Sequence, residues 1–286
     1  MKPIRLLAPL AGAGLVLAAA GCGGSTNVQA PTVAPAAVYQ LVHVEPSGPV
    51  QAGKPVRVSF TIQQPDGQPL TRFKTGPGPH TGVHLILVRD DLAYLIHEHP
   101  PVGQATIAKT VVFPAPGPYR MVVDVYPAAS DQQINANFQL FDSVRVAGVY
   151  RPKPLPPPAS ATTVDGYHFT LHGANDLKAI SPALVTVEVT GPGGSKPTFT
   201  PWFGALAHAI FFRKGSLDYF HTHVCAPGAS GCASILGGAT VTGSSATPGK
   251  LNVGVLVPVG GTWRLFLQTR IDGKIVTAPY TLHVAS

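Results

Sequence analysis

A repeat at the scale of a whole domain constrains the fold of this chain more than any other feature of its sequence. The segment 83–89 aligns with 207–213, and the later segment 113–120 aligns with 257–264. Between these blocks the second copy is about twenty residues longer than the first. Repetition over such a distance indicates that a domain was duplicated, so the two halves of the chain should share one fold.

Each half contains short segments in which apolar and polar residues alternate, as they do in a half-buried strand. The clearest are 56–62 and 184–189. Further strand-like segments are 38–45, 83–89, 92–99, 106–113, 118–126, 136–147, 164–171, 206–213, 217–224, 250–257, 262–269 and 274–284. The chain has 31 Gly, 30 Pro and only 12% charged residues, which suits many turns and few charged helix surfaces. The predicted fold class is all-β, with two tandem immunoglobulin-like β-sandwich domains related by internal duplication.

A Pro-rich stretch between the halves marks the domain boundary. The run from Arg151 to Pro158 contains five prolines, which favour an extended polyproline conformation and cannot enter the interior of a sheet. We therefore predict β-sandwich domain 1 at residues 38–149, a linker at 150–160 and β-sandwich domain 2 at 161–286.

The N-terminus has the features of a bacterial lipoprotein signal peptide. Lys2 and Arg5 precede an apolar stretch, which ends in Ala19-Ala20-Gly21-Cys22 and resembles a lipobox. This resemblance implies that residues 1–21 are removed and that Cys22 is lipidated, with residues 22–37 as a flexible tether. We expect an extracytoplasmic protein of the cell envelope that is lipid-anchored to the membrane. An ordinary secreted protein with an incidental cysteine is the alternative.

The other cysteines and the charge restrict the chemistry further. Cys225 and Cys232 lie in the insertion of the second half, and outside the cytosol a local disulfide between them is the simplest expectation. The net charge of +7 includes two basic residues of the leader, and the chain has no dense Lys/Arg run. Nucleic acid is therefore not an expected partner.

Six of the eleven histidines form one pattern that occurs twice. In both halves a histidine is followed by two more, 13 and 15 residues later, and the six are His84, His97, His99, His208, His221 and His223. A single histidine on a strand is most often a hydrogen-bonded structural residue, and a structural cluster inherited by duplication would show the same repetition. The same triad in both halves nevertheless favours a metal site in each domain.

Hairpin geometry gives the spacing a meaning. A two-residue turn at Asp90-Asp91 would place His84 directly opposite His97, with His99 on the same face of the hairpin. The same construction at Lys214-Gly215 applies to the second triad. Three imidazoles on one face can converge on one ion. Because these strands are apolar on both faces, we expect them in the middle of each sandwich, with the histidines at a solvent-accessible rim.

The ligand type restricts the metal. Imidazole suits Zn(II), Cu(II) and Ni(II), whereas a Met-rich Cu(I) site is excluded because Met121 is the only methionine beyond the leader. The expected cofactor is a divalent transition metal, Cu(II) or Zn(II). His80 could add a fourth ligand in the first domain. Asp124 is a weaker candidate, because Gln268 replaces it in the second half.

The hairpins also resemble a known family. The stretches HLILVRDDLAYLIHEHP at 84–100 and HAIFFRKGSLDYFHTHV at 208–224 are similar to tandem His-x-His-Pro hairpins of actinobacterial-type secreted and lipid-anchored proteins. The resemblance covers most of 75–125 and 200–270, and it implies heavy-metal handling, especially of copper, at the cell envelope. Val224 stands where proline is usual, so the second site departs from the pattern.

The leading functional hypothesis is an extracytoplasmic lipoprotein that binds a divalent transition metal through a three-His site in each domain, for sequestration or delivery. Its expected partners are the membrane, metal ions and a metal transporter or another envelope protein. The alternative is a non-catalytic adhesion or structural protein of the envelope without metal. An enzyme is not expected and no catalytic residue is assigned, because no carboxylate is repeated near the triads. Glu98 projects to the opposite face, and its counterpart is Thr222.

Overall fold

The computed structural model describes residues 38–128, 137–228 and 247–286, and these fold as two tandem immunoglobulin-like β-sandwiches. This architecture confirms the predicted fold class. The helical elements in these ranges are two single 3₁₀ turns, η1 (Ala174–Asp176) and η2 (Pro192–Gly194). The described part of the chain has no helix with the length and apolar character needed to span a membrane.

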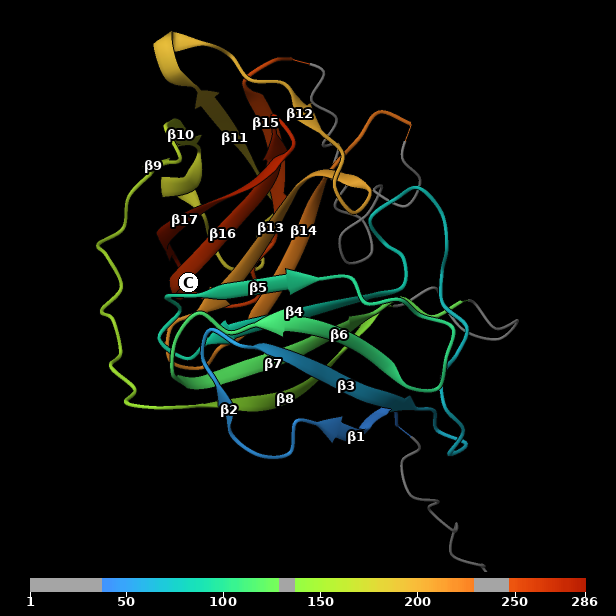
Figure 1. The fold of residues 1–286 in the computed structure, drawn as a ribbon. Helices are drawn as coiled ribbons and strands as arrows, with labels where there is room; N and C mark the ends of the chain where they lie inside the picture. Colours follow the sequence, from blue (N-terminus) through green and yellow to red (C-terminus); the bar gives the residue numbers. More distant parts are fainter. Residues whose placement is uncertain (1–37, 129–136, 229–246) are drawn as a thin grey trace, which may run out of the picture. The chain divides into compact units, whose positions relative to one another are not determined.

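The first sandwich consists of a three-stranded and a five-stranded sheet (Figure 1). The three-stranded sheet has the order β1 (Gln40–Glu45), β3 (Pro55–Gln63) and β6 (Ile107–Val112). The five-stranded sheet has the order β2 (Val50–Gln51), β8 (Phe138–Ala147), β7 (Gly117–Val125), β4 (Val83–Arg89) and β5 (Leu95–Glu98). The hairpin that carries the first histidine triad therefore lies at the β4–β5 edge of the larger sheet.

The second sandwich repeats this plan. Its four-stranded sheet has the order β15 (Lys250–Val255), β11 (Ala183–Thr190), β10 (Tyr167–His172) and β9 (Ala161–Val164). Its five-stranded sheet contains β12 (Phe199–Thr200), β16 (Gly261–Ile271), β13 (Ala205–Arg213) and β14 (Tyr219–Cys225), with β17 (Lys274–Val284) paired to β16. The hairpin β13–β14 is thus the equivalent of β4–β5, and β16 is the equivalent of β7.

The register of both hairpins differs from the prediction by two residues. The loop after β4 has four residues instead of two, because the backbone N–H of Arg89 donates to the carbonyl of Tyr94 at 3.0 Å. Leu92 turns into the left-handed region with φ 60° and buries its side chain, which a two-residue turn at Asp90-Asp91 would not allow. Ile86 consequently lies opposite His97. A shift of two residues keeps every side chain on its face.

The second hairpin shows the same shift. The N–H of Arg213 donates to the carbonyl of Asp218 at 2.9 Å, so the loop again has four residues and the predicted turn at Lys214-Gly215 is wrong. His208 now lies opposite His223 rather than His221. The two triads therefore keep the same internal arrangement in both hairpins.

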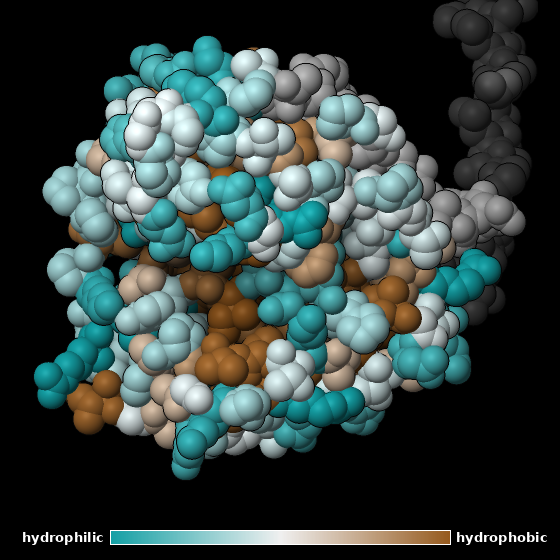
Figure 2. Space-filling model, turned by 45° about the horizontal axis from the view of Figure 1, so that its top comes forward, coloured by the Kyte–Doolittle hydropathy of each residue, from teal (hydrophilic) through white to brown (hydrophobic). Residues whose placement is uncertain are grey.

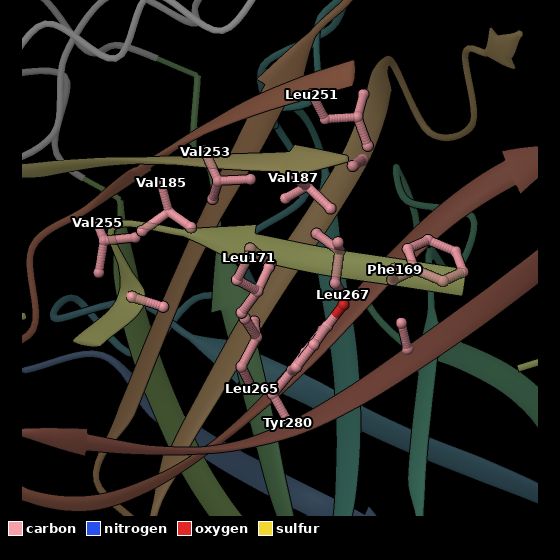
Figure 3. Close-up of a cluster of buried hydrophobic side chains, with 14 of the residues drawn as sticks. Phe169, Leu171, Val185, Val187, Leu251, Val253, Val255, Leu265, Leu267 and Tyr280 are labelled. Carbon is pink, nitrogen blue, oxygen red and sulfur yellow. The ribbon is translucent and has the colours of Figure 1, made fainter. Parts of the chain in front are cut away.

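Each sandwich has its own hydrophobic core between its two sheets. In the second, Phe169, Val187, Leu265, Leu267 and Tyr280 meet between the sheets, as Figure 3 shows. In the first, the inward faces of β3, β4, β6 and β7 supply the equivalent residues. Burial of this apolar surface, at roughly 25 cal/mol per Å², is the main source of stability. Figure 2 shows a surface with many hydrophilic side chains and some hydrophobic ones within a hollow of this face.

A third apolar cluster joins the two sandwiches, which belong to one compact unit. Ile86, Val88 and Val122 of the first sandwich meet Ile210, Phe212 and Phe266 of the second. These residues occupy the faces of β4, β7, β13 and β16 that point away from their own cores. Both faces of β4 are buried for this reason, since each packs against a different partner.

The linker contacts the first sandwich and the apolar cluster that joins the two sandwiches. The N–H of Lys153 donates to Asp91 at 2.7 Å, its ammonium donates to the hydroxyl of Tyr94 at 2.9 Å, and Leu155 packs on the third cluster. Figure 1 shows this segment as an extended trace between β8 and β9. The linker does not keep the two domains apart, because their large sheets pack on each other.

Candidate metal centre

The two predicted histidine triads lie together between the sandwiches. They occupy the same faces as the third apolar cluster: His84 and His208 lie two residues before Ile86 on β4 and Ile210 on β13, and the other four lie on β5, directly after it, or on β14. His84 and His208 are 0% exposed, and His97 and His223 are 5% and 3% exposed. The expected solvent-accessible rim is therefore wrong: the second sandwich covers the first triad, and the first sandwich covers the second.

The cluster contains two overlapping groups of four histidines. One is His84, His97, His99 and His208; the other is His84, His208, His221 and His223. Within each group, one ring nitrogen per residue lies within 4.8 Å of the others. Each group is one domain's triad plus the first histidine of the other domain. The structure thus brings all six predicted residues together, but not as two separate sites.

A backbone carbonyl fixes the tautomer of the first histidine in each triad. Nε2 of His84 lies 2.8 Å from the carbonyl oxygen of Pro79, and Nε2 of His208 lies 2.9 Å from that of Trp202. Because a carbonyl only accepts, Nε2 must carry the proton and Nδ1 keeps its lone pair. An imidazole oriented in this way is typical of metal sites, where the second ring nitrogen is held by an outer partner.

Close contact between two loops positions these carbonyls. Gly204 adopts φ 76°, and a Cβ at this position would lie 2.5 Å from the carbonyl carbon of Gly78 in the first sandwich. Only glycine fits such an approach in such a conformation. The loops that carry Pro79 and Trp202 are therefore in direct contact beside the cluster.

The middle histidine of each triad contacts a polar residue of the other sandwich. Nδ1 of His97 donates to Oε1 of Gln268 at 2.9 Å, and Nδ1 of His221 lies 3.6 Å from Oδ2 of Asp124. Asp124 lies opposite His84 on β7, and Gln268 lies opposite His208 on β16. The two sandwiches thus exchange equivalent contacts. The sequence identified Asp124 and Gln268 as counterparts but not this crossed arrangement.

Aromatic rings and His80 complete the surroundings. The ring of Phe203 stacks on His99 with centroids 3.8 Å apart and an interplanar angle of 10°. Nε2 of His80 lies 3.0 Å from Nδ1 of His223, so this candidate fourth ligand of the first domain contacts the triad of the second. His80 also stacks on Tyr126, with centroids 5.3 Å apart. The sequence did not predict a role for Phe203, Tyr126 or Trp202.

Five buried ring nitrogens of the cluster have no hydrogen-bond partner among the residues that the structure describes. They are Nδ1 of His84, Nε2 of His97, Nε2 of His99, Nδ1 of His221 and Nε2 of His223. Leaving one buried polar atom unsatisfied costs about 1–3 kcal/mol. Native structures leave few such atoms, and a concentration of them in one place calls for a ligand. Lone pairs converging from several imidazoles fit a metal cation.

Burial also keeps the cluster neutral. It lowers the pKa of His84 to about 3 and the pKa of His208 to about 4. It lowers the pKa of His97, His221 and His223 well below the usual value, with the neighbouring histidines as a further cause. Burial lowers the pKa of His99 as well. Neutral imidazole is the form that binds metal, so these side chains need not lose protons first at pH 7.

Glu98 and the three cysteines lie outside the cluster or outside the described ranges. Glu98 pairs with Lys109 of β6 at 2.9 Å and points away from the histidines. Cys225 ends β14 and is 7% exposed, whereas Cys232 and the predicted lipidation site Cys22 are outside the described residues. The Cys225–Cys232 bond and the lipid anchor therefore stay predictions.

The sequence profile described as "Domain of unknown function (DUF8832)" matches residues 37–143 and 162–286. The chain belongs to the DUF8832 family. Each matched segment of this DUF8832 protein contains one of the two histidine triads. A comparison with curated proteins gives no match.

The solved structures that match this DUF8832 chain are distant from it. A mutant alpha-2-macroglobulin from Salmonella is 12% identical with a TM-score of 0.26, and the match covers 86% of this chain but 15% of that one. Fibronectin(III)-like modules of CbhA from Clostridium thermocellum are 12% identical with a TM-score of 0.21, covering 87% and 93% of the two chains. A putative membrane anchored protein from Corynebacterium diphtheriae is 8% identical with a TM-score of 0.26, covering 88% and 60%. We infer nothing about function from these likenesses.

Proposed function

We propose that this protein is an extracytoplasmic lipoprotein that binds a divalent transition-metal ion, Cu(II) or Zn(II), between its two sandwiches, for sequestration or delivery. The observation that carries the proposal is that four histidines bring one ring nitrogen each to within 4.8 Å of one another, in a cluster where five buried ring nitrogens have no hydrogen-bond partner among the described residues. The extracytoplasmic location rests on the lipobox-like sequence that ends at Cys22.

The donor set favours borderline metals. The described ligand candidates are neutral imidazoles, which suit Zn(II) and Cu(II), whereas Ca²⁺ and Mg²⁺ require oxygen ligands. A tetrahedral ion with bonds of about 2.0–2.1 Å needs four such nitrogens. Each four-histidine group offers that number, with separations that a small inward movement of the rings would close.

The two four-histidine groups cannot each hold an ion with four ligands at the same time. His84 and His208 belong to both groups, and each has only Nδ1 to offer because Nε2 donates to a backbone carbonyl. We therefore expect one tight equivalent of metal per protein. Further ions would find at most an incomplete ligand set and bind more weakly. This replaces the expectation of one independent site in each domain.

Metal content of the untagged protein tests the proposal. The soluble form that begins after Cys22 is purified without a histidine tag, stripped with a chelator and titrated with Zn(II) and with Cu(II). We expect one tight equivalent by calorimetry and by elemental analysis, and no tight equivalent when His84 and His208 are both replaced by Ala. If the wild-type protein takes up neither ion, the proposal fails and a structural role for the histidine cluster replaces it.

A further inference from the structure

Asp124 is a buried carboxylate next to the histidine cluster. Its side chain is 2% exposed. Oδ2 accepts from the hydroxyl groups of Tyr219 at 3.2 Å and Tyr126 at 3.4 Å, and Oδ1 accepts from the amides of Asn137 at 3.2 Å and Gln139 at 3.1 Å. All four groups donate, so the carboxyl acts only as an acceptor, which is the role of the ionised form.

The charge of this carboxylate has no strong partner among the described residues. Among the described residues its one ion-pair contact is His221, whose Nδ1 lies 3.6 Å from Oδ2, and no Lys or Arg pairs with it. A buried charge is strongly unfavourable unless it is compensated. Four neutral donors satisfy its hydrogen bonds but supply no opposite charge. A cation bound on the far side of the His221 ring would supply it.

The equivalent position in the second sandwich provides an internal comparison. Gln268 contacts His97 as Asp124 contacts His221, but its side chain is neutral. Gln268 also donates to the hydroxyl of Thr277 at 3.1 Å, so its own hydrogen bonds are satisfied without a cation. The two halves of the cluster are therefore similar in geometry and different in charge.

We propose that Asp124 is the charge-compensating and positioning residue of the metal centre and acts through His221 of the other sandwich. The inference rests on the proposed metal-binding function and deepens it. A carboxylate behind a ligating imidazole orients the ring and raises its basicity as a ligand, and losing such a partner typically weakens metal affinity by about 10–100-fold. The half of the cluster that contains His221 and His223 is then the preferred half for a dication.

The test is the variant Asp124→Asn, with two measurements on the protein that begins after Cys22. Zn(II) affinity is measured by competition with a chromophoric chelator, and Tm is measured after the metal has been removed. We expect the affinity to fall by about 10–100-fold. We expect the metal-free Tm to stay equal or to rise, because an uncompensated buried charge has been removed and the two phenols can turn to accept from the new amide.

Two further variants make the result decisive. Asp66→Asn removes the same charge from an exposed turn and should leave both values unchanged. Gln268→Glu places a carboxylate behind His97 and should tighten Zn(II) binding. An unchanged affinity in Asp124→Asn overturns the proposal. A lower metal-free Tm also overturns it, because Asp124 would then be a structural acceptor. No Zn(II) uptake by the wild type would refute the metal function itself, and the inference with it.

Discussion

Because the two four-histidine groups share His84 and His208, substitutions at different histidines should weaken metal binding to different extents. This difference is the strongest test of the cluster. Each of the two shared histidines belongs to both groups, whereas His97 and His99 belong to only one. Replacing His84 by Ala should therefore impair every arrangement of four ligands. Replacing His97 and His99 together should leave the group of His84, His208, His221 and His223 complete.

The magnitude follows from mass action. An ion that binds only the folded state adds about 2.7 kcal/mol to the free energy of unfolding at a hundredfold excess over the dissociation constant. Loss of a direct ligand should weaken binding by at least the roughly 100-fold that loss of an outer partner can cause. At the same Zn(II) concentration, the increase in the free energy of unfolding that Zn(II) gives to His84→Ala then falls to about 0.4 kcal/mol or less. The His97/His99 double variant should keep most of the gain.

Denaturant unfolding with and without Zn(II) measures this gain for each variant. Each variant is compared with itself, because truncation of a buried side chain by itself costs about 2–5 kcal/mol. His168→Ala is the matched control, since it removes an exposed histidine that lies outside the cluster and contacts Thr163. A full metal-dependent gain in His84→Ala would refute the shared-ligand reasoning. A complete loss of this gain in the His97/His99 double variant as well as in His84→Ala would point to a site confined to the first sandwich.

Three other predictions can be checked separately. Burial lowers the pKa of His84 and His208 to about 3 and about 4, so the unfolded state binds protons more readily. The metal-free protein should lose stability as pH falls from about 6.5 towards 4, by about 2 kcal/mol per histidine at pH 5, and a denaturant series across this pH range that stays flat would contradict this. Cys22→Ser should release the protein from membranes, as fractionation would show; a variant that stays membrane-bound and uncleaved would indicate a spanning segment. Cys225 and Cys232 should be oxidised to each other, and mass spectrometry after non-reducing alkylation would detect two free thiols if they are not.

The fold was accessible from the sequence because its signals are local. Alternation in 56–62 and 184–189, the turns between segments and the duplicated hairpins predict two similar sandwiches, and the structure has them. The short strands β2, β9 and β12 gave no such signal, since a strand of two to four residues hardly shows a period. The predicted length of the hairpin turn was wrong, because burial of Leu92 and the contact of Arg89 with Asp91 favour the four-residue loop.

That the histidines of each triad share one face could also be predicted from the sequence, because an error of two residues in register leaves each side chain on its own face. The outer partners of these histidines could not be predicted in this way. His223 contacts His80 across 143 residues of sequence, and His97 contacts Gln268 across 171. Such contacts depend on how the two sandwiches pack, and neither residue spacing nor periodicity within one domain contains that information.

One signal did point to this packing. The strands that became β4 and β13 are apolar on both faces, and a single sandwich offers such strands only one core. The second apolar face is buried only if another apolar surface packs against it. In a duplicated chain, the equivalent face of the other copy has the same apolar pattern and can pack there. Because the first histidine of each triad lies on that second face, pairing of the two faces brings the triads together. A site formed by both copies is therefore the consistent solution, whereas two sites open to solvent would leave Ile86, Val88, Ile210 and Phe212 uncovered.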